Sequence, residues 1–194
     1  MKRLLFNIML YASSIFSIIA CEGTFIPDPI DPRLPKYTEN GHNVAGAFIN
    51  NTIWRSKVSI GFPHIADNKP FIILFQDSDS LVICFSGNTN IDARAISFHM
   101  SNLGISKFED LSFLNGKKIQ LDGVNNVGYC DKWYSSLFIL DKGIGQIYFR
   151  NVSLNSTSTG IIISGTFGFS TNAITVSHGR FDYRINKDSN FQIE

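Results

Sequence analysis

Charged side chains are scarce in this sequence, and neither sign is in clear excess. Only 17% of the 194 residues are charged, with 17 lysines and arginines against 16 aspartates and glutamates. A domain that binds nucleic acid through charge carries a basic stripe and an excess of Lys and Arg. We therefore expect no nucleic-acid partner.

The sequence also lacks the spaced residue sets that mark common metal and catalytic sites. Its four histidines, at positions 42, 64, 99 and 178, stand too far apart for the spacing of a zinc site. Asp77-Ser78-Asp79 resembles the start of a calcium loop, but the glycine and distal glutamate are missing, so a polar turn is expected. No nucleophile elbow, S-x-x-K pair or glycine-rich phosphate loop is present. We expect no metal and no cofactor, while a catalytic set that assembles only in space stays open.

The first 20 residues resemble a bacterial lipoprotein signal. Lys2 and Arg3 give a cationic start, an apolar run follows, and Ala20 precedes Cys21. The apolar run is short for a membrane-spanning helix of about 20 residues, and a small residue before cysteine lets a peptidase reach the bond. The resemblance implies that residues 1–20 are removed and that Cys21 is acylated at the new N-terminus. An ordinary secretory signal or an uncleaved anchor is the alternative.

Acylation of Cys21 implies an address in the cell envelope. Each buried CH2 of an acyl chain contributes about 0.8 kcal/mol, so several chains make the membrane attachment effectively permanent. We expect a lipid anchor in the outer membrane, with either a periplasmic or an exterior orientation. The loss of Lys2 and Arg3 with the signal leaves 15 basic against 16 acidic side chains, a formal charge of −1.

A proline-rich segment follows the acylated cysteine. Residues 21–36 hold four of the six prolines of the chain. Such a segment is stiff and extended, and at about 3.1 Å per residue it spans about 45 Å. We expect residues 21–36 to be a tether and residues 37–194 to form a single β-rich domain.

The stretch Gly160–Ile185 predicts two long antiparallel strands joined by a turn at Ser170–Ala173. Apolar residues fall on odd numbers before the turn, on even numbers at Ile174 and Val176, and on odd numbers again from Phe181. A period of two is typical of a half-buried strand, so the change of parity requires one extra residue. We predict a β-bulge at Ser177-His178-Gly179, with Gly179 in a positive-φ conformation.

Further strands and one short helix are expected in the rest of the chain. Residues 44–60 predict a hairpin with its turn at Asn50-Asn51. The unbroken apolar runs Phe71–Phe75 and Leu81–Phe85 are typical of central strands covered on both faces. Ser106 and Glu109 suggest a capping box for a helix that ends at Gly116. Other strands are expected at residues 91–100, 118–121, 133–140 and 146–152.

About ten strands with one short helix predict an all-β fold. The arrangement is either an antiparallel β-sandwich or a partly closed barrel, and the strand pattern alone does not choose between them. No internal repeat is present.

Two blocks of the sequence resemble a group of Bacteroidetes lipoproteins of unknown function. The first block, residues 34–54, holds a Leu-Pro pair and an Asn-x-x-x-Trp turn. The second holds Ser-Gly-Thr-Phe at residues 164–167 and Gly-Arg-Phe-Asp at residues 179–182. The resemblance implies the fold and the lipoprotein address. It carries no activity, cofactor or catalytic residue to this chain.

Three aromatic residues suggest a contact surface. Tyr129, Trp133 and Tyr134 cluster outside the clearly apolar strands. Aromatic faces bind sugars and partner proteins, so the cluster is a candidate for either kind of contact. The alternative is that these side chains fill the core from the edge of a strand.

Two cysteines remain once Cys21 is acylated. An oxidising envelope permits a disulfide between Cys84 and Cys130. Cys84 lies within an apolar strand, however, where a free thiol also packs well. The sequence leaves both states open.

Gly179, Arg180 and Asp182 form a distinctive set near the C-terminus. Their match to the Gly-Arg-Phe-Asp pattern of the resembled group suggests a functional role. The alternative is structural, with Arg180 bound to a neighbouring carboxylate or loop carbonyl and holding the bulge in place.

The sequence favours a non-enzymatic envelope lipoprotein that binds a partner protein or a glycan. A hydrolase acting on envelope or dietary polymers is the alternative, and it predicts a pocket whose histidine or carboxylates have shifted pKa values. A structural component of a larger lipoprotein assembly is a third possibility, and it predicts a flat apolar patch.

Overall fold

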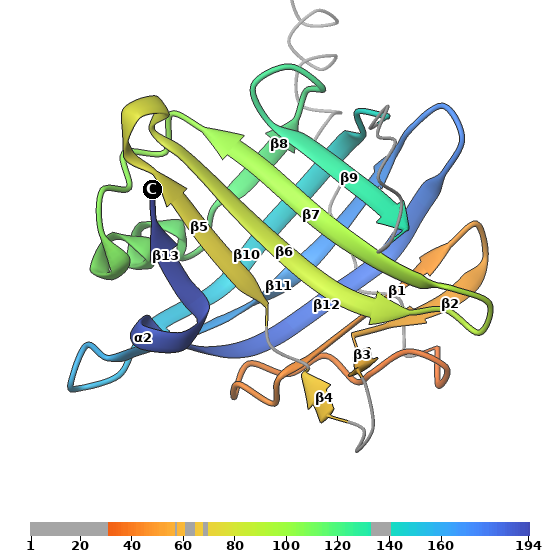
Figure 1. Ribbon diagram of the computed structural model, residues 1–194, viewed down its shortest axis with the longest axis horizontal. Helices are drawn as coiled ribbons and strands as arrows, with labels where there is room; N and C mark the ends of the chain where they lie inside the picture. Colours follow the sequence, from red (N-terminus) through yellow and green to blue (C-terminus); the bar gives the residue numbers. More distant parts are fainter. Residues whose placement is uncertain (1–30, 57, 61–64, 68–69, 133–140) are drawn as a thin grey trace, which may run out of the picture.

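The computed structural model describes residues 31–56, 58–60, 65–67, 70–132 and 141–194. Eleven of the described strands form one strongly curled sheet, which makes a partly closed barrel (Figure 1). β3 (Val58–Ile60) and β4 (Ile65–Asp67) form a separate two-stranded sheet beside it. The prediction of an all-β fold with little helix is confirmed.

One side of the barrel, which we call the front wall, consists of four antiparallel strands and one short parallel strand. In spatial order these are β13 (Phe191–Ile193), β5 (Phe71–Phe75), β6 (Ser80–Asn88), β7 (Ala93–Ser101) and β9 (Val127–Lys132). Only β13 is parallel to its neighbour. β9 was not predicted, and the strand expected at residues 133–140 lies outside the described residues.

The opposite side, the back wall, contains the long hairpin predicted from the sequence. In spatial order its strands are β2 (Thr52–Arg55), β1 (Val44–Ile49), β12 (Thr175–Asn186), β11 (Gly160–Ser170), β10 (Ile144–Leu154) and β8 (Lys118–Leu121). The two walls join where Arg55 pairs with Asn88 and where Gly128 forms a bridge with Gly143.

The helical segments are short. They are η1 (Gln76–Ser78), η2 (Phe108–Leu114) and α2 (Lys187–Asn190). η2 is the predicted short helix, but the predicted capping box was wrong. The Ser106 hydroxyl donates to the Asp110 carboxylate at 2.8 Å, whereas Glu109 pairs with Lys187. The box does not form because η2 begins at Phe108 with Lys107 as its N-cap, so Ser106 lies one residue before the N-cap.

Aromatic rings fill the space between the two walls. Phe85 of the front wall stacks on Tyr183 of the back wall with ring centroids 5.3 Å apart, and it lies equally close to Phe181. Phe98 contacts Phe167 at 5.2 Å. All these rings are buried, and offset or edge-on contacts at such distances are favourable. The interior of the barrel is therefore a packed core.

The predicted turn and bulge are both present, with one correction. Asn50 and Asn51 have φ values of 46° and 65°, as the predicted hairpin turn requires. The register of β12 against both β1 and β11 shifts by one residue around positions 177–179. The positive φ of 54° belongs to His178, however, and not to Gly179. Gly179 is required for space, since a Cβ there would lie 2.3 Å from the Phe167 ring.

The apolar runs in β5 and β6 were predicted to be covered on both faces, and this prediction was wrong for the described structure. Both strands alternate between buried and half-buried or exposed residues. The inward side chains, such as Ile72 and Ile83, are fully buried, whereas Phe71 on the outer face is 44% exposed. The outer face of the front wall thus carries apolar side chains, such as Phe71, that the described residues leave partly exposed.

Candidate functional site

Residues 31–42, which we call the strap, lie across the outer face of the back wall. Leu34 is only 4% exposed, and Pro35 packs so closely on Gly46 that a Cβ at position 46 would lie 2.3 Å from its ring. Arg55 donates to the Arg33 carbonyl at 2.6 Å. Residues 31–36, the last part of the tether predicted over residues 21–36, therefore pack against the domain, and residues 21–30 lie outside the described residues.

The carboxylate of Asp182 fastens the strap to β12. Its side chain is 2% exposed and accepts hydrogen bonds from the Thr38 hydroxyl at 2.5 Å and from the backbone N–H groups of Asn40, Gly41 and His42. Burial alone would raise the pKa of Asp182, but the bonds from Thr38, Gly41 and His42 outweigh it and lower that pKa below its usual value. Asp182 is thus a carboxylate whose ionised form is stabilised by the strap.

His42 and Asp182 are in contact. A histidine that acts as a catalytic base is often oriented by a carboxylate in the same way. The His42 Nδ1 atom lies 3.1 Å from the Asp182 carboxylate and 2.9 Å from the Thr38 hydroxyl. Beside them, the strap lies on β12 too tightly to leave a water-sized cavity between Pro35 and Asp182. The His42 side chain itself is 57% exposed, and its contacts with Thr38 and Asp182 hold the strap on β12.

Arg180 and Gly179 also have structural contacts. The Arg180 guanidinium donates to the carbonyl of Pro35 at 3.3 Å, which is the loop-carbonyl contact expected from the sequence. Gly179 lets β12 pass close to Phe167. The contacts of Gly179, Arg180 and Asp182 agree with the structural alternative.

Cys84 and Cys130 are free thiols, so the possible disulfide is absent. They lie two strands apart, with β7 between them, and they project to opposite faces. Cys84 pairs with Ser97 on the outer face, whereas Cys130 pairs with the buried Ile96. A disulfide requires Cβ atoms about 4 Å apart, which opposite faces exclude. Burial raises the pKa of each thiol to about 11, so neither is a reactive nucleophile at neutral pH.

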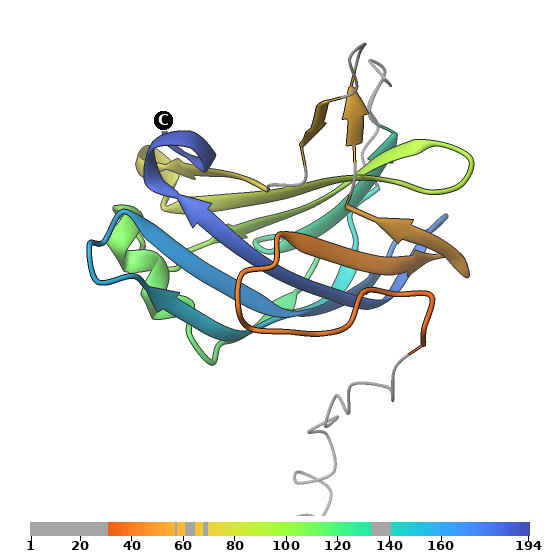
Figure 2. The ribbon, with the colours of Figure 1, turned by 90° about the horizontal axis from the view of Figure 1, so that it is seen from below.

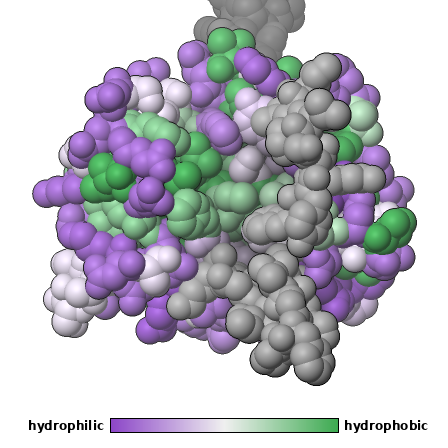
Figure 3. Space-filling model, viewed as in Figure 1, coloured by the Kyte–Doolittle hydropathy of each residue, from purple (hydrophilic) through white to green (hydrophobic). Residues whose placement is uncertain are grey.

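The outer surface of the front wall carries apolar side chains together with polar ones such as Ser80, Ser86 and Ser97. Directly opposed residues in a sheet project to the same face, and the registers of β5, β6, β7 and β9 therefore define its rows. Hydrophobic residues gather near the middle of this side of the molecule, with hydrophilic residues to their left and below them (Figure 3). We call the following outward-facing set the apolar face: Phe71, Ile73, Phe75, Val82, His99 and Tyr129.

The predicted aromatic contact cluster overlaps this face at one residue. Tyr129 lies on it and contacts the His99 ring edge-on, with centroids 4.7 Å apart. Burial lowers the pKa of His99, which favours the neutral imidazole on an apolar surface. Trp133, Tyr134 and the predicted acylation site Cys21 lie outside the described residues.

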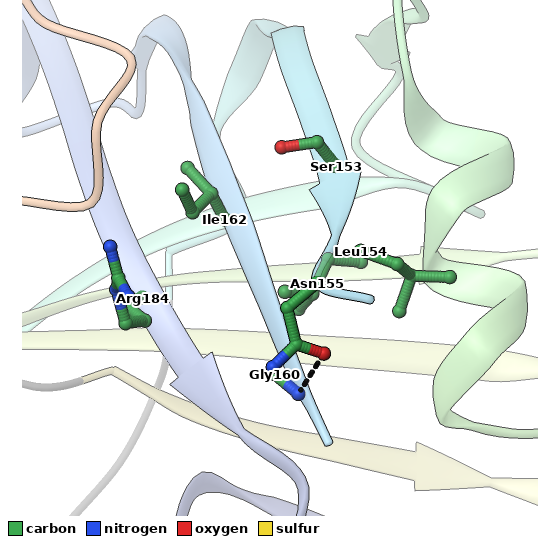
Figure 4. A pocket seen from close by; sticks show the side chains of 7 residues that line it. Ser153, Leu154, Asn155, Gly160, Ile162 and Arg184 are labelled. Carbon is green, nitrogen blue, oxygen red and sulfur yellow. Dashed lines mark hydrogen bonds between the residues drawn. The ribbon is translucent and has the colours of Figure 1, made fainter. Parts of the chain in front are cut away.

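A small hollow lies beside the turn that joins β10 and β11 (Figure 4). It has a volume of about 90 Å³, and Arg184 and Asn155 are among its lining residues. Asn155 already accepts hydrogen bonds from the backbone of Thr159 and Gly160. Small-molecule sites usually have volumes of about 300 Å³ or more, so this hollow is too small for a substrate.

A second, open groove of about 390 Å³ lies where the strap begins. Arg33 lines it and stacks over the Phe48 ring at 4.8 Å. The guanidinium is already paired with Asp31 at 2.6 Å, and hydrogen bonds from Arg33 lower the pKa of Asp31 to about 2. The positive charge in this groove is therefore largely compensated.

The described residues contain no group of three or more His, Cys, Asp or Glu side chains that could hold a metal ion. In the same part of the chain, none of the helices has the length and apolarity that a membrane crossing requires.

No protein-family model, curated protein or solved structure matches this chain. Membership in the Bacteroidetes lipoprotein group therefore stays a prediction. The apolar face was missed as a site in the sequence, although the unbroken apolar runs of β5 and β6 were its signal.

Proposed function

We propose that this protein is a lipid-anchored protein of the cell envelope, held in the outer membrane through Cys21, and that its β-barrel is a non-enzymatic binding or assembly module. The Bacteroidetes lipoprotein group is the proposed family. The proposal combines the lipobox-like sequence at residues 1–21 with the arrangement of the described barrel.

The observation that carries the proposal is that the strap and the apolar face lie on opposite walls of the barrel. The described chain begins at Asp31, and its strap is fastened along the back wall by Arg180 and Asp182. The apolar face lies on the other wall, while the interior is filled by aromatic rings. Among the described residues, the apolar face presents Phe71, which is 44% exposed, together with half-buried apolar side chains, and exposed apolar surface of this kind suits protein contact and assembly.

The address can be tested by metabolic labelling with an alkyne-bearing palmitate analogue in the native cells. The wild-type protein should carry the label and sediment with the outer membrane, and the Cys21→Ala variant should carry none. A Cys84→Ala variant is the matched control and should be labelled like the wild type. An unlabelled wild-type protein, or equal labelling of the Cys21→Ala variant, would disprove the lipid anchor.

The binding role is separated from hydrolysis by substitutions at the groups that a hydrolase would need. If the barrel acts only by binding, the wild type should hydrolyse envelope glycans and peptides no faster than the buffer control. The His42→Ala variant should give the same result. Turnover by the wild type that is lost in His42→Ala would favour the hydrolase.

A further inference from the structure

Positive charge is concentrated on the outer face of the back wall. Among the described outward positions of β8, β10, β11 and β12 and residues 35–42 of the strap, the exposed cations are Lys36, Lys118, Arg150 and Arg184. Glu39 is the one exposed carboxylate at these positions. Arg180 and Asp182 also lie there, but the strap covers both and their opposite charges cancel. Four exposed cations against one carboxylate give this surface, which we call the basic face, a net charge of +3.

The register of the back wall brings these cations close together. The row that starts with Lys118 on β8 continues across β10 and β11 to Arg180 on β12, and Arg184 lies four residues further along β12. With strands about 4.8 Å apart and about 3.4 Å per residue, Lys118 and Arg184 are about 20 Å apart. Arg150 lies on β10, between the strands that carry these two residues. A planar anionic surface can therefore meet all of these cations at once.

The front wall has no comparable charge. At the described outward positions of β5, β6, β7 and β9 there is no lysine or arginine, and Asp131 is the one carboxylate. The chain without residues 1–20 has a formal charge of −1, so the positive charge of the basic face is offset elsewhere on the molecule. Such an asymmetry gives a protein a preferred orientation toward a charged surface.

The strap places the N-terminal part of the described chain on the same side as the basic face. Figure 2 shows the strap, in orange, along the side of the barrel that β1 and β12 form, with β6 and β7 on the opposite side. Asp31, where the described chain begins, lines a groove together with Phe48 of β1 and Ser177 of β12. The ten residue steps from Cys21 to Asp31 span at most about 35 Å. A bilayer that holds an acylated Cys21 is thus within reach of the basic face.

We propose that the basic face is a membrane-contact surface that lies against the anionic phosphate headgroups of the bilayer holding the lipid anchor. This inference rests on the proposed function and specifies how the anchored barrel is oriented. Each Lys or Arg within a Debye length of an anionic lipid surface is attracted to it. Tyr148, half-buried with the Lys118 ammonium 5.4 Å from its ring, has the amphipathic side chain typical of membrane–water interfaces. The apolar face then points away from the bilayer.

The tether distinguishes the bilayer from other anionic partners. Nucleic acid or a soluble anionic glycan would be attracted by the same charges. A surface joined to the barrel by a short tether, however, is present at a high effective concentration, so a weak contact is enough to keep the two together. The modest charge of the basic face is therefore sufficient for the bilayer.

Site-specific photocrosslinking to lipid tests this inference. The full-length acylated protein is made with p-benzoyl-phenylalanine in place of Gln120, which is exposed on the same face as Lys118, or in place of Phe71 on the front wall. Each version is reconstituted into vesicles of phosphatidylcholine and phosphatidylglycerol at about three to one, or of phosphatidylcholine alone. In the anionic vesicles we expect about fivefold more lipid adduct at position 120 than at position 71. The excess should be lost in phosphatidylcholine alone and in about 1 M NaCl, where the Debye length is about 3 Å.

Thermal unfolding of both versions shows whether they are folded. Gln146 pairs with Gln120 on the same face, and it takes the crosslinker if the Gln120 version does not unfold like the wild type.

Charge reversal at two lysines tests the role of the basic face. The Lys36→Glu/Lys118→Glu variant, with the crosslinker at position 120, should lose about fivefold of its lipid adduct in anionic vesicles. Lys107→Glu/Lys142→Glu is the matched control, because it makes the same change in formal charge at two exposed lysines outside the basic face. It should keep the adduct of the parent protein. Equal losses in the two double variants would show that total charge, and not the basic face, governs the contact, and would overturn the inference.

Other crosslinking results overturn the inference as well. These are equal lipid adducts at positions 71 and 120, more lipid adduct at position 71, an adduct at position 120 that is the same in both kinds of vesicle, or no lipid adduct. In the native cells, an adduct of position 120 with a protein or a glycan in place of lipid would also overturn it. Palmitate labelling of Cys21 separates the two claims. A labelled protein with any of these results would retain its anchor and lose this orientation.

Discussion

The carboxylate of Asp182 accepts a 2.7 Å hydrogen bond from the backbone N–H of Gly41, although the two residues lie 141 positions apart in the chain. Gly41 has a φ of 73°, a conformation that favours glycine, and this turn directs its N–H toward β12. The bond joins the first described segment of the chain to its last long strand. The strap is therefore an integral part of the folded barrel.

Replacing Asp182 with the isosteric Asn should lower the free energy of unfolding by about 2 kcal/mol. The change removes the negative charge to which Thr38 and Gly41 donate, and charge-assisted bonds of this kind contribute about 1.5–3 kcal/mol. Urea denaturation followed by circular dichroism gives the value. Asp188→Asn on the exposed surface is the control and should change it by less than about 0.5 kcal/mol. Equal losses in both variants would contradict the role of Asp182.

The contribution of Asp182 should depend on pH in a defined direction. Because its pKa in the folded protein is lowered, the ionised carboxylate stabilises the fold above the ordinary aspartate pKa of about 3.9. This contribution is lost as the pH falls through the folded-state pKa. Wild type and Asp182→Asn should therefore differ most at pH 7 and converge progressively below about pH 4. A difference that grows on acidification would refute this sign.

Gly179→Ala should destabilise the barrel by about 1–3 kcal/mol, the usual range for overpacking a core. The added methyl group would lie 2.3 Å from the Phe167 ring and 2.5 Å from the Phe167 carbonyl oxygen, on the strand with which β12 is paired. Gly168→Ala on the adjacent strand is a matched control. A Cβ at position 168 meets only the Val176 carbonyl at 3.4 Å, so its effect should stay below about 1 kcal/mol. Similar melting temperatures for the two variants would exclude the steric explanation.

Both internal thiols should be titratable without reductant. In urea, Ellman's reagent should find two thiols in the acylated protein, and Cys84→Ala should reduce this to one. In the folded protein both should react slowly at pH 7.4, since a pKa of about 11 leaves on the order of 10⁻⁴ to 10⁻³ of each thiol ionised. Finding no reactive thiol in urea until a reductant is added would show a disulfide after all.

Local pattern predicted the features that depend on neighbouring residues. The change of parity between Val176 and Phe181 located the bulge, because a strand must keep its apolar side chains on one face. It did not show that His178 has the positive φ, since glycine is the residue that adopts this conformation most easily. The same limit applies to η2, where the pairing of Ser106 with Asp110 instead of Glu109 depends on the residue at which the helix begins.

Features that depend on register could not be read from the sequence. Cys84 and Cys130 each lie in an apolar surrounding, and only the pairing of β6, β7 and β9 shows that they face opposite sides. The partners of Asp182 are similarly distant in the chain. β9 was missed because Gly128 and Asp131 weaken its strand pattern.

The apolar face shows a different limit of sequence analysis. An unbroken apolar run such as Phe71–Phe75 has the same pattern whether a second layer of its own chain covers it or another molecule does. The sequence therefore led to the prediction that Phe71–Phe75 and Leu81–Phe85 are covered on both faces. It did not indicate that the described residues leave the outer one partly exposed.

The contact between Phe85 and Tyr183 across the barrel has a consequence for kinetics. With the centre occupied by stacked rings, recognition takes place on the exterior, and no gate has to open before a ligand arrives. Association should then be limited by diffusion and orientation, with a rate constant of about 10⁵–10⁷ M⁻¹s⁻¹, and the observed rate should rise linearly with ligand concentration without reaching a plateau.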